Sequence, residues 1–297
     1  MPLASTDLSG GVALITGAAS GIGKETAFAF AESGVAAIAL ADRSPVNEEI
    51  LEKCRSLSCG IKLMLVTVDV SSEKSVAEMV QGVVSEFGRI DYCVHAAGIP
   101  NLTWVKTADV DMDIFDKIHA TNARGTMLVL RDVSRAMAQQ APRTYTSPRH
   151  KDAERSTGRG AIVVIASLAG LIAAPTMAPY ASAKAAVVGM CKTAAAENIS
   201  HNIRVNSVCP GWIDTPMVQS ALAEHPELES GFRDMMPRGK FGMPEEVADA
   251  IVFLCSPAAS FVNGASLLVD AGQSLMQLAM MLYLNSVYER AKAMEAG

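Results

Sequence analysis

The stretch V-A-L-I-T-G-A-A-S-G-I-G, residues 12–23, joins an apolar run to a glycine-rich segment. Its first five residues form an apolar run that predicts a buried strand. Gly17, Gly21 and Gly23 follow, and a helical pattern over residues 22–33 begins among them. Glycines at this spacing permit a tight turn, a close approach of the backbone to a pyrophosphate, and close packing of helix on strand, with the phosphates at the helix N-terminus. The stretch therefore predicts a phosphate-binding loop between a strand and a helix.

Strands and helices continue to alternate along the rest of the chain. Apolar runs predict strands at residues 12–16, 36–41, 62–68, 92–96, 162–166, 204–208 and 266–269. Helical patterns lie between them at residues 48–56, 72–87 and 111–139, from residue 178 onward, and at 244–254. This order predicts an α/β fold, a single-domain Rossmann-type doubly wound parallel sheet of about seven strands with helices on both faces.

Polar residues and one glycine follow several of these predicted strands. In an open parallel sheet, ligands bind at the carboxyl ends of the strands, so we expect Thr16, Asp42, Asp69, Gly98 and Ser167 to converge there. Asp42 lies about twenty residues beyond the glycine loop, where a carboxylate can accept hydrogen bonds from the hydroxyls of an adenosine ribose. A solvated turn residue is the alternative interpretation of Asp42.

The stretch A-P-Y-A-S-A-K, residues 178–184, is typical of a helix start and places Tyr180 and Lys184 on one helix face. A nearby ammonium favours the phenolate, which would bring the tyrosine pKa down from about 10 toward the range of a usable acid/base. Ser167 could hold a substrate oxygen beside the phenol. Taken alone, the Y-x-x-x-K pattern is usually an ordinary helix-surface pair, so this hypothesis depends on the rest of the chain.

Composition excludes several classes of function. Half of the 297 residues are hydrophobic and the net charge is -6, which argues against nucleic acid as the main partner. The cysteines show no C-x-x-C spacing and the histidines no ligand pair, so neither a zinc site nor a disulfide framework is predicted. No signal peptide and no apolar run of transmembrane length is evident, so we expect no membrane span and a cytoplasmic location.

Three segments and one asparagine fall outside this core pattern. We expect residues 1–274 to form the dinucleotide-binding catalytic domain, with a flexible surface insertion at 140–160, a lid-like segment at 211–242, and a tail at 275–297. Asn122 interrupts a helical pattern and is equally compatible with a satisfied core amide or a functional one. The basic side chains of the insertion could form an anion site, although a solvated loop is the favoured interpretation. These side chains belong to Arg143, Arg149, Lys151, Arg155 and Arg159.

Taken together, the glycine loop, Asp69, Asn122, Ser167, the Tyr180–Lys184 pair and the Pro210–Gly211 turn resemble the short-chain dehydrogenase/reductase family over roughly residues 11–272. The resemblance implies that the catalytic residues are Asn122, Ser167, Tyr180 and Lys184. Tyr180 would be the acid/base, Lys184 would lower its pKa and bind the nicotinamide ribose, and Ser167 would position the substrate oxygen. Asn122 would support a proton-relay water.

The same resemblance implies a nicotinamide dinucleotide cofactor. We expect NAD, because Asp42 would repel a 2′-phosphate, although Arg43 beside it makes NADP possible. Thr215 would contact the carboxamide. The full set of expected cofactor-binding residues is Gly17, Ser20, Gly21, Ile22, Gly23, Asp42, Arg43, Asp69, Val70, Ala97, Gly98, Asn122, Tyr180, Lys184, Pro210, Gly211, Ile213 and Thr215.

The sequence departs from the family pattern at His95 and Ala96, where asparagines are usual, and at Ala166, where a second serine is frequent. We expect these changes to alter local bonding more than chemistry. In proteins of the resembled family, the helices that hold Asn122 and Tyr180 pair between subunits. The resemblance therefore implies a homodimer or homotetramer, and the tail residues Leu278, Met281, Leu282 and Leu284 add apolar surface that a membrane surface could bind instead.

The leading functional hypothesis is an NAD(P)-dependent oxidoreductase that interconverts a secondary alcohol and a ketone. Apolar residues near the expected mouth favour an apolar small-molecule substrate, although several of them could equally be core. They are Ile172, Ala173, Ala174, Met177, Trp212, Met217, Met235 and Met236. Two alternatives stay open: the same scaffold used for a non-redox cyclisation or isomerisation, and a cofactor-sensing binding protein without turnover.

Overall fold

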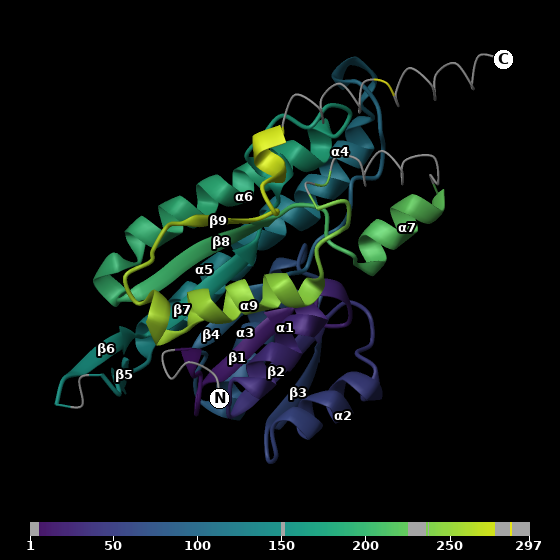
Figure 1. Ribbon diagram of the computed structural model, residues 1–297. Helices are drawn as coiled ribbons and strands as arrows, with labels where there is room; N and C mark the ends of the chain where they lie inside the picture. Colours follow the sequence, from purple (N-terminus) through teal and green to yellow (C-terminus); the bar gives the residue numbers. More distant parts are fainter. Residues whose placement is uncertain (1–5, 150–151, 225–235, 237, 277–285, 287–297) are drawn as a thin grey trace.

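The computed structural model describes residues 6–149, 152–224, 236, 238–276 and 286, and Figure 1 shows their arrangement. One parallel sheet of seven strands organises the molecule, in the order β3-β2-β1-β4-β7-β8-β9. This confirms the predicted α/β fold with one doubly wound sheet. The strands are β1 (Val12–Thr16), β2 (Ala37–Asp42), β3 (Lys62–Thr67), β4 (Tyr92–His95), β7 (Gly160–Ile165), β8 (Ile203–Pro210) and β9 (Ser266–Val269).

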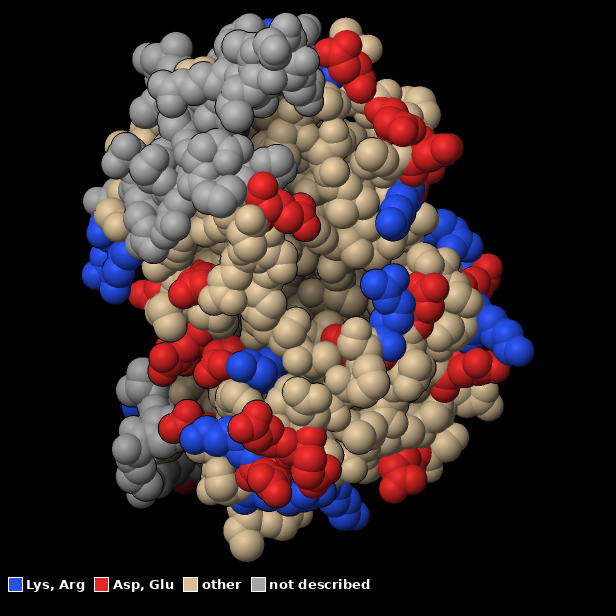
Figure 2. All heavy atoms as spheres, turned by 90° about the vertical axis from the view of Figure 1, so that its right-hand side faces the viewer, with Lys and Arg blue, Asp and Glu red and all other residues tan. Residues whose placement is uncertain are grey.

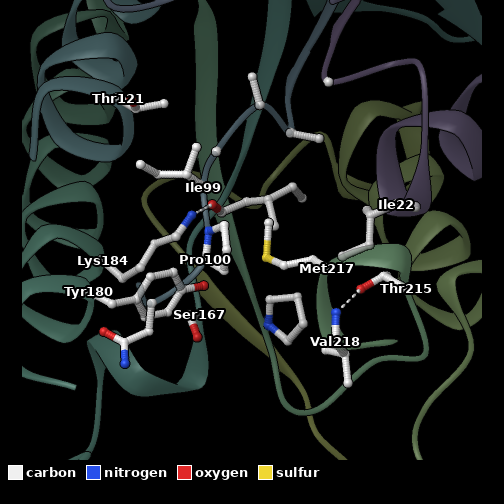
Figure 3. A pocket seen from close by; sticks show the side chains of 18 of the residues that line it. Ile22, Ile99, Pro100, Thr121, Ser167, Tyr180, Lys184, Thr215, Met217 and Val218 are labelled. Atoms are coloured by element: carbon white, nitrogen blue, oxygen red, sulfur yellow. Dashed lines mark hydrogen bonds between the residues drawn. The ribbon is translucent and has the colours of Figure 1, made fainter. Parts of the chain in front are cut away.

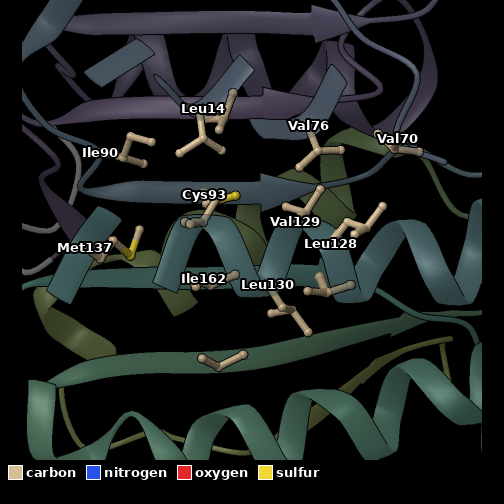
Figure 4. Packing of buried hydrophobic residues seen from close by; sticks show 14 of the residues in the cluster. Leu14, Val70, Val76, Ile90, Cys93, Leu128, Val129, Leu130, Met137 and Ile162 are labelled. Atoms are coloured by element: carbon tan, nitrogen blue, oxygen red, sulfur yellow. The ribbon is translucent and has the colours of Figure 1, made fainter. Parts of the chain in front are cut away.

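Helices cover both faces of the sheet because the central strands are apolar on both sides. Leu14 and its neighbours on one face pack against α3 (Glu73–Phe87), α5 (Gly125–Gln139) and α6 (Ala178–Glu197), as Figure 4 shows for part of this cluster. Ile15 points to the other face, where α1 (Gly21–Glu32), α2 (Glu48–Leu57) and α9 (Pro244–Cys255) pack. The alternation of side chains along β1 therefore divides one continuous apolar strand between two cores.

The predicted single helix over residues 111–139 is wrong in detail. The chain forms α4 (Met112–His119), a π-helical turn (Ala120–Arg124) and then α5. The Asn122 amide lies in this turn and bonds the backbone of Ile99 twice, with its oxygen accepting at 2.8 Å and its nitrogen donating at 2.9 Å. A π-helical turn inside a helix is rare and frequently marks a functional site.

Residues 140–160 are more ordered than the predicted flexible loop. They contain an antiparallel hairpin, β5 (Arg143–Thr146) and β6 (Glu154–Gly158), which lies at the amino ends of the strands in Figure 1. Arg143 contacts Asp91 at 3.2 Å and the Ser9 carbonyl at 2.6 Å. Arg155 donates to the Pro257 carbonyl and Arg159 to the Gln140 carbonyl. Arginine side chains therefore bond this segment to the rest of the protein, whereas the sequence favours a solvated loop.

The segment at 211–242 contributes α7 (Pro216–Glu224) at the opposite end of the sheet. Met235 and the tail residues Leu278, Met281, Leu282 and Leu284 lie outside the described residues, as does Lys151. Across the described part of the chain, the helices are too short or too polar to cross a membrane.

Candidate active site

A cavity of about 580 Å³ opens at the carboxyl ends of the strands. Figure 2 looks onto this face and shows a hollow lined mainly by uncharged side chains. The residues expected from the sequence for cofactor binding all line the cavity except Asn122, and Ser167 lines it as well. Asp42, Asp69, Gly98 and Ser167 line the cavity as expected, whereas Thr16 does not, because it is fully buried and bonded to His95. The roles of the individual residues stay predictions.

The glycine loop forms a backbone cradle at the start of α1. Gly17 has a φ of +71°, and a Cβ there would meet the Ala97 backbone nitrogen at 2.7 Å. A Cβ on Gly23 would lie 2.2 Å from the Gly17 carbonyl oxygen. Ser20 caps α1 without a side-chain cap bond, so its hydroxyl is not consumed by the helix. The cradle exists because side chains are missing from it, which fits a pyrophosphate at a helix N-terminus.

Two carboxylates stand beside this cradle. Asp42, at the end of β2, accepts the Ala19 amide at 3.0 Å and the Ser44 amide at 2.8 Å. Asp69 accepts both the hydroxyl and the amide of Ser71, and these hydrogen bonds lower the pKa of the Asp69 carboxyl. Asp42 is thus held in place by backbone donors, which fits the ribose of an adenosine moiety. The residues present fit a nicotinamide dinucleotide.

Tyr180 and Ser167 meet at the inner end of the cavity. Ser167 follows β7 and caps a short 3-10 turn, while Tyr180 is in the first turn of α6. Figure 3 shows the two hydroxyls next to each other, with Met217 pointing into the same space. A Cβ on Gly170 would lie 2.7 Å from the backbone carbon of Lys184, so only glycine lets this turn pack closely on α6.

Lys184 lies one helical turn below Tyr180. Its side chain is 6% exposed, and the ammonium donates to the Ile165 carbonyl at 2.8 Å. Burial lowers the pKa of Lys184 to about 8. The ammonium lies 5.7 Å from the Tyr180 ring centroid. Burial raises the pKa of Tyr180, and the hydrogen bond from Ser167 opposes that rise. The expected downward shift of the tyrosine pKa is therefore not found, because burial of the phenol is the largest influence on it.

Asn122 and His95 are both buried beneath the cavity. Asn122 is a satisfied amide that holds Ile99, as described above, and its position next to Gly98 brings it close to Lys184. His95 is 1% exposed, with Nδ1 at 2.7 Å from the Thr16 hydroxyl. Burial, and next the charge of Lys184, lower the pKa of His95 to about 3. The departure at His95 therefore places a neutral imidazole below the site.

Several cavity residues were not predicted from the sequence. They come from the loop after β4, from α4, from the π-helical turn and from α7, and include Ile99, Pro100, Asn101, Trp104, Lys117, Thr121, Val218 and Ala221. None of them belongs to a motif with a fixed spacing. Of the apolar residues expected at the mouth, Ala174, Met177, Trp212 and Met217 line the cavity. Ile172 and Met236 pack nearby, and Ala173 is exposed.

Comparisons with known proteins agree with this geometry. A family model described as enoyl-(acyl carrier protein) reductase matches residues 17–274. The short-chain dehydrogenase fogB of Aspergillus ruber is 41% identical over 268 residues, covering 89% of this chain and 97% of its own. A 2,5-dichloro-2,5-cyclohexadiene-1,4-diol dehydrogenase of Sphingobium indicum is 36% identical, covering 90% and 98%. The crystal structure of levodione reductase superimposes with a TM-score of 0.80 at 32% identity, covering 90% and 98%.

Fold and site thus define a dinucleotide-dependent oxidoreductase with a tyrosine, serine and lysine at the sheet's carboxyl edge. The chain belongs to the short-chain dehydrogenase/reductase family, which confirms the resemblance stated from its motifs.

Proposed function

We propose that this protein is an NAD(P)-dependent oxidoreductase that interconverts a secondary alcohol and a ketone on an apolar small molecule. The observation that carries the proposal is that the Tyr180 and Ser167 hydroxyls lie next to each other in the lining of the cavity. Two hydroxyls together can hold one substrate oxygen and exchange a proton with it. The names of the similar proteins, a diol dehydrogenase and a reductase, support this reaction class.

The residues divide the work as follows. The glycine cradle would hold the pyrophosphate, Asp42 the adenosine ribose, Lys184 the nicotinamide ribose and Thr215 the carboxamide. A bound nicotinamide would accept a hydride from the alcohol carbon or return it to the ketone carbon. Tyr180 donates a proton to the ketone oxygen in reduction and takes it from the alcohol in oxidation. Ser167 holds the same oxygen in place throughout.

The raised pKa of Tyr180 suits the reduction direction, because a buried phenol stays protonated near neutral pH. Oxidation requires the phenolate, which the positive charges of Lys184 and of an oxidised nicotinamide would favour. Asn122 contributes by holding the Ile99 backbone that lines the cavity, and a relay water beside it remains part of the proposal.

A screen of alcohols and ketones, followed by the change in nicotinamide absorbance, tests this proposal. We expect at least one apolar ketone or secondary alcohol to be turned over. Product formation without any change in absorbance would instead favour the non-redox cyclisation or isomerisation. Cofactor binding without any product would favour the sensing protein.

We also propose a homodimer or homotetramer in the cytoplasm. Met112 on α4 and Met127 on α5 are 60% and 46% exposed, which supports an apolar contact on these helices. All six cysteines are free thiols, and five of them are buried, which supports a reducing compartment. Light scattering at micromolar concentration should give at least twice the monomer mass.

A further inference from the structure

Both tryptophans of the chain line the same cavity. Trp104 comes from the loop between β4 and α4, and Trp212 follows β8 directly. Each indole is half-buried. Two residues that are distant in the sequence thus bring the largest aromatic side chains to one wall.

This aromatic wall is separate from the two cores that hold the sheet. Trp104 and Trp212 pack with Ile172, Val218 and Leu222 on the buried side chains of Met236 and Phe241, which are 7% and 8% exposed. Neither indole belongs to the clusters on the sheet faces. The cores on the two faces of the sheet therefore do not require an indole at either position. Both indoles pack on the same small cluster and line the same cavity.

Most of the described residues that line the cavity are uncharged. Ala174, Met177 and Met217 line it together with the two indoles, and Tyr180 and Ser167 supply hydroxyls. The charged lining residues come from other elements: Asp42 and Arg43 from the end of β2, Asp69 from the end of β3, Lys117 from α4 and Lys184 from α6. A substrate carboxylate or phosphate against this wall would lose its water without gaining a paired cation.

We propose that the substrate is a neutral aromatic carbonyl compound, or the corresponding benzylic alcohol, whose ring lies against Trp104 and Trp212. The inference rests on the proposed function, because it uses Tyr180 and Ser167 to fix the carbonyl oxygen. A flat ring against an indole gains a specific aromatic contact in addition to the burial of its area. A saturated ring of the same size gains only the burial.

Tetralone and decalone test this directly, because the two bicyclic ketones have the same carbon skeleton and only tetralone contains an aromatic ring. We expect kcat/KM for tetralone to exceed that for decalone by about three- to tenfold for each indole in contact. Trp104→Leu and Trp212→Leu should each remove this preference in part by raising KM for tetralone. Both should lower kcat/KM for decalone less than for tetralone.

Two controls separate aromatic contact from general damage. Trp104→Phe and Trp212→Phe keep an aromatic ring and should restore part of the preference that leucine removes. Phe261→Leu changes the fully exposed aromatic residue after α9, and it should alter neither ketone's kinetics. Equal losses for tetralone and decalone in the leucine variants would overturn the inference.

Tryptophan fluorescence gives a readout that does not require turnover. Each phenylalanine variant retains a single indole, because the chain has two in all. Titration of either variant with tetralone in the presence of cofactor should quench that indole, and decalone should have a smaller effect. Quenching in both variants without turnover of any ketone would support the aromatic wall and overturn the proposed function. Absence of quenching in both variants would overturn the wall.

Discussion

Buried charged groups at the two ends of the sheet differ in their bonding partners. At the amino end, the buried carboxylate of Asp91 accepts from Arg89 at 2.6 Å, from Arg143 at 3.2 Å and from the Val12 amide at 2.9 Å. The cavity beside it measures about 20 Å³. At the carboxyl end, the buried Lys184 ammonium donates to the Ile165 carbonyl beside a cavity of about 580 Å³.

We interpret the polar groups at the amino end of the sheet as structural and those at the carboxyl end as functional. A buried charge that is fully paired stabilises a connection, here between the body and the hairpin. A buried charge that faces a cavity without a carboxylate partner costs stability, and such groups cluster at functional sites. The following substitutions at the two ends test whether this division holds.

The largest expected effect is at the carboxyl end, on turnover. Tyr180→Phe removes the acid/base and should lower kcat by at least about a hundredfold, while the Kd for NAD stays within a few-fold. Steady-state kinetics and cofactor titration measure the two quantities. Tyr145→Phe on the hairpin is the matched control and should leave both unchanged. Near-normal turnover of an identified substrate by Tyr180→Phe would refute the redox assignment.

The next effect is at the amino end, on stability. Asp91→Asn removes the charge between two guanidinium groups and should lower the free energy of unfolding by about 2 kcal/mol. The variant should retain wild-type kcat, because the cavity lies at the other end of the sheet. Urea denaturation measures the loss, with the exposed Asp249→Asn as the control. If Asp91→Asn loses turnover to the same degree as Tyr180→Phe, the two ends are not independent.

The sequence predicts the residues at the carboxyl end of the sheet better than the contacts at its amino end, and the reason is physical. The chemistry proposed for Gly17, Asp42, Ser167 and Tyr180 would fix their type and spacing, so it would leave a pattern in the sequence. The ion pair of Asp91 with Arg143 joins residues 52 positions apart, and no periodicity in the sequence indicates such a contact. The hairpin was therefore predicted as a flexible loop.

Part of the site could not be predicted from the sequence because it depends on contacts between separate elements. Trp104 lies in an irregular loop, and only the tertiary fold brings it to Trp212. The π-helical turn at Asn122 was not predicted within the long helical pattern, because its side-chain bonds to Ile99 join separate elements. The direction of the tyrosine pKa also required coordinates, since burial of the phenol is its largest cause.

A smaller effect at the carboxyl end concerns cofactor choice. The wild-type protein should bind NADH more tightly than NADPH, because Asp42 would repel a 2′-phosphate. Asp42→Asn keeps an oxygen that can accept the Ser44 amide but removes the charge, so the ratio of the two Kd values should move about tenfold toward NADPH. Fluorescence titration of each cofactor measures the ratio. Glu48→Gln, on the exposed start of α2, should leave the ratio unchanged. Tighter binding of NADPH by the wild-type protein would contradict the assignment of Asp42.

The smallest expected effect concerns the free energy of unfolding, which the buried charge of Lys184 lowers. Burial lowers the pKa of Lys184 from 10.5 to about 8, which corresponds to roughly 3 kcal/mol of penalty for the charged form. The hydrogen bond to Ile165 recovers part of that penalty, since a bond from a charged donor contributes about 1.5–3 kcal/mol. Lys184→Met removes both terms, so at pH 7 it should raise the free energy of unfolding by about 1 kcal/mol while abolishing efficient turnover.

The pH dependence distinguishes this explanation from better packing of the methionine. Between about pH 8 and 10.5 the unfolded chain keeps the lysine proton that the folded protein has released, so the Lys184 contribution to stability rises with pH across this window. Below about pH 8 the full penalty applies. The stability gain of Lys184→Met over the wild type should therefore shrink as the pH is raised from 7 to 10. The cysteines of the two unfolded chains titrate alike and cancel in the difference. In the folded protein, burial raises the pKa of Cys191 to about 12 and also raises that of Cys209, the two thiols whose charges influence Lys184. A gain that stays constant with pH would mean that the buried charge is not its cause, and the contrast between the two ends of the sheet would lose its energetic basis.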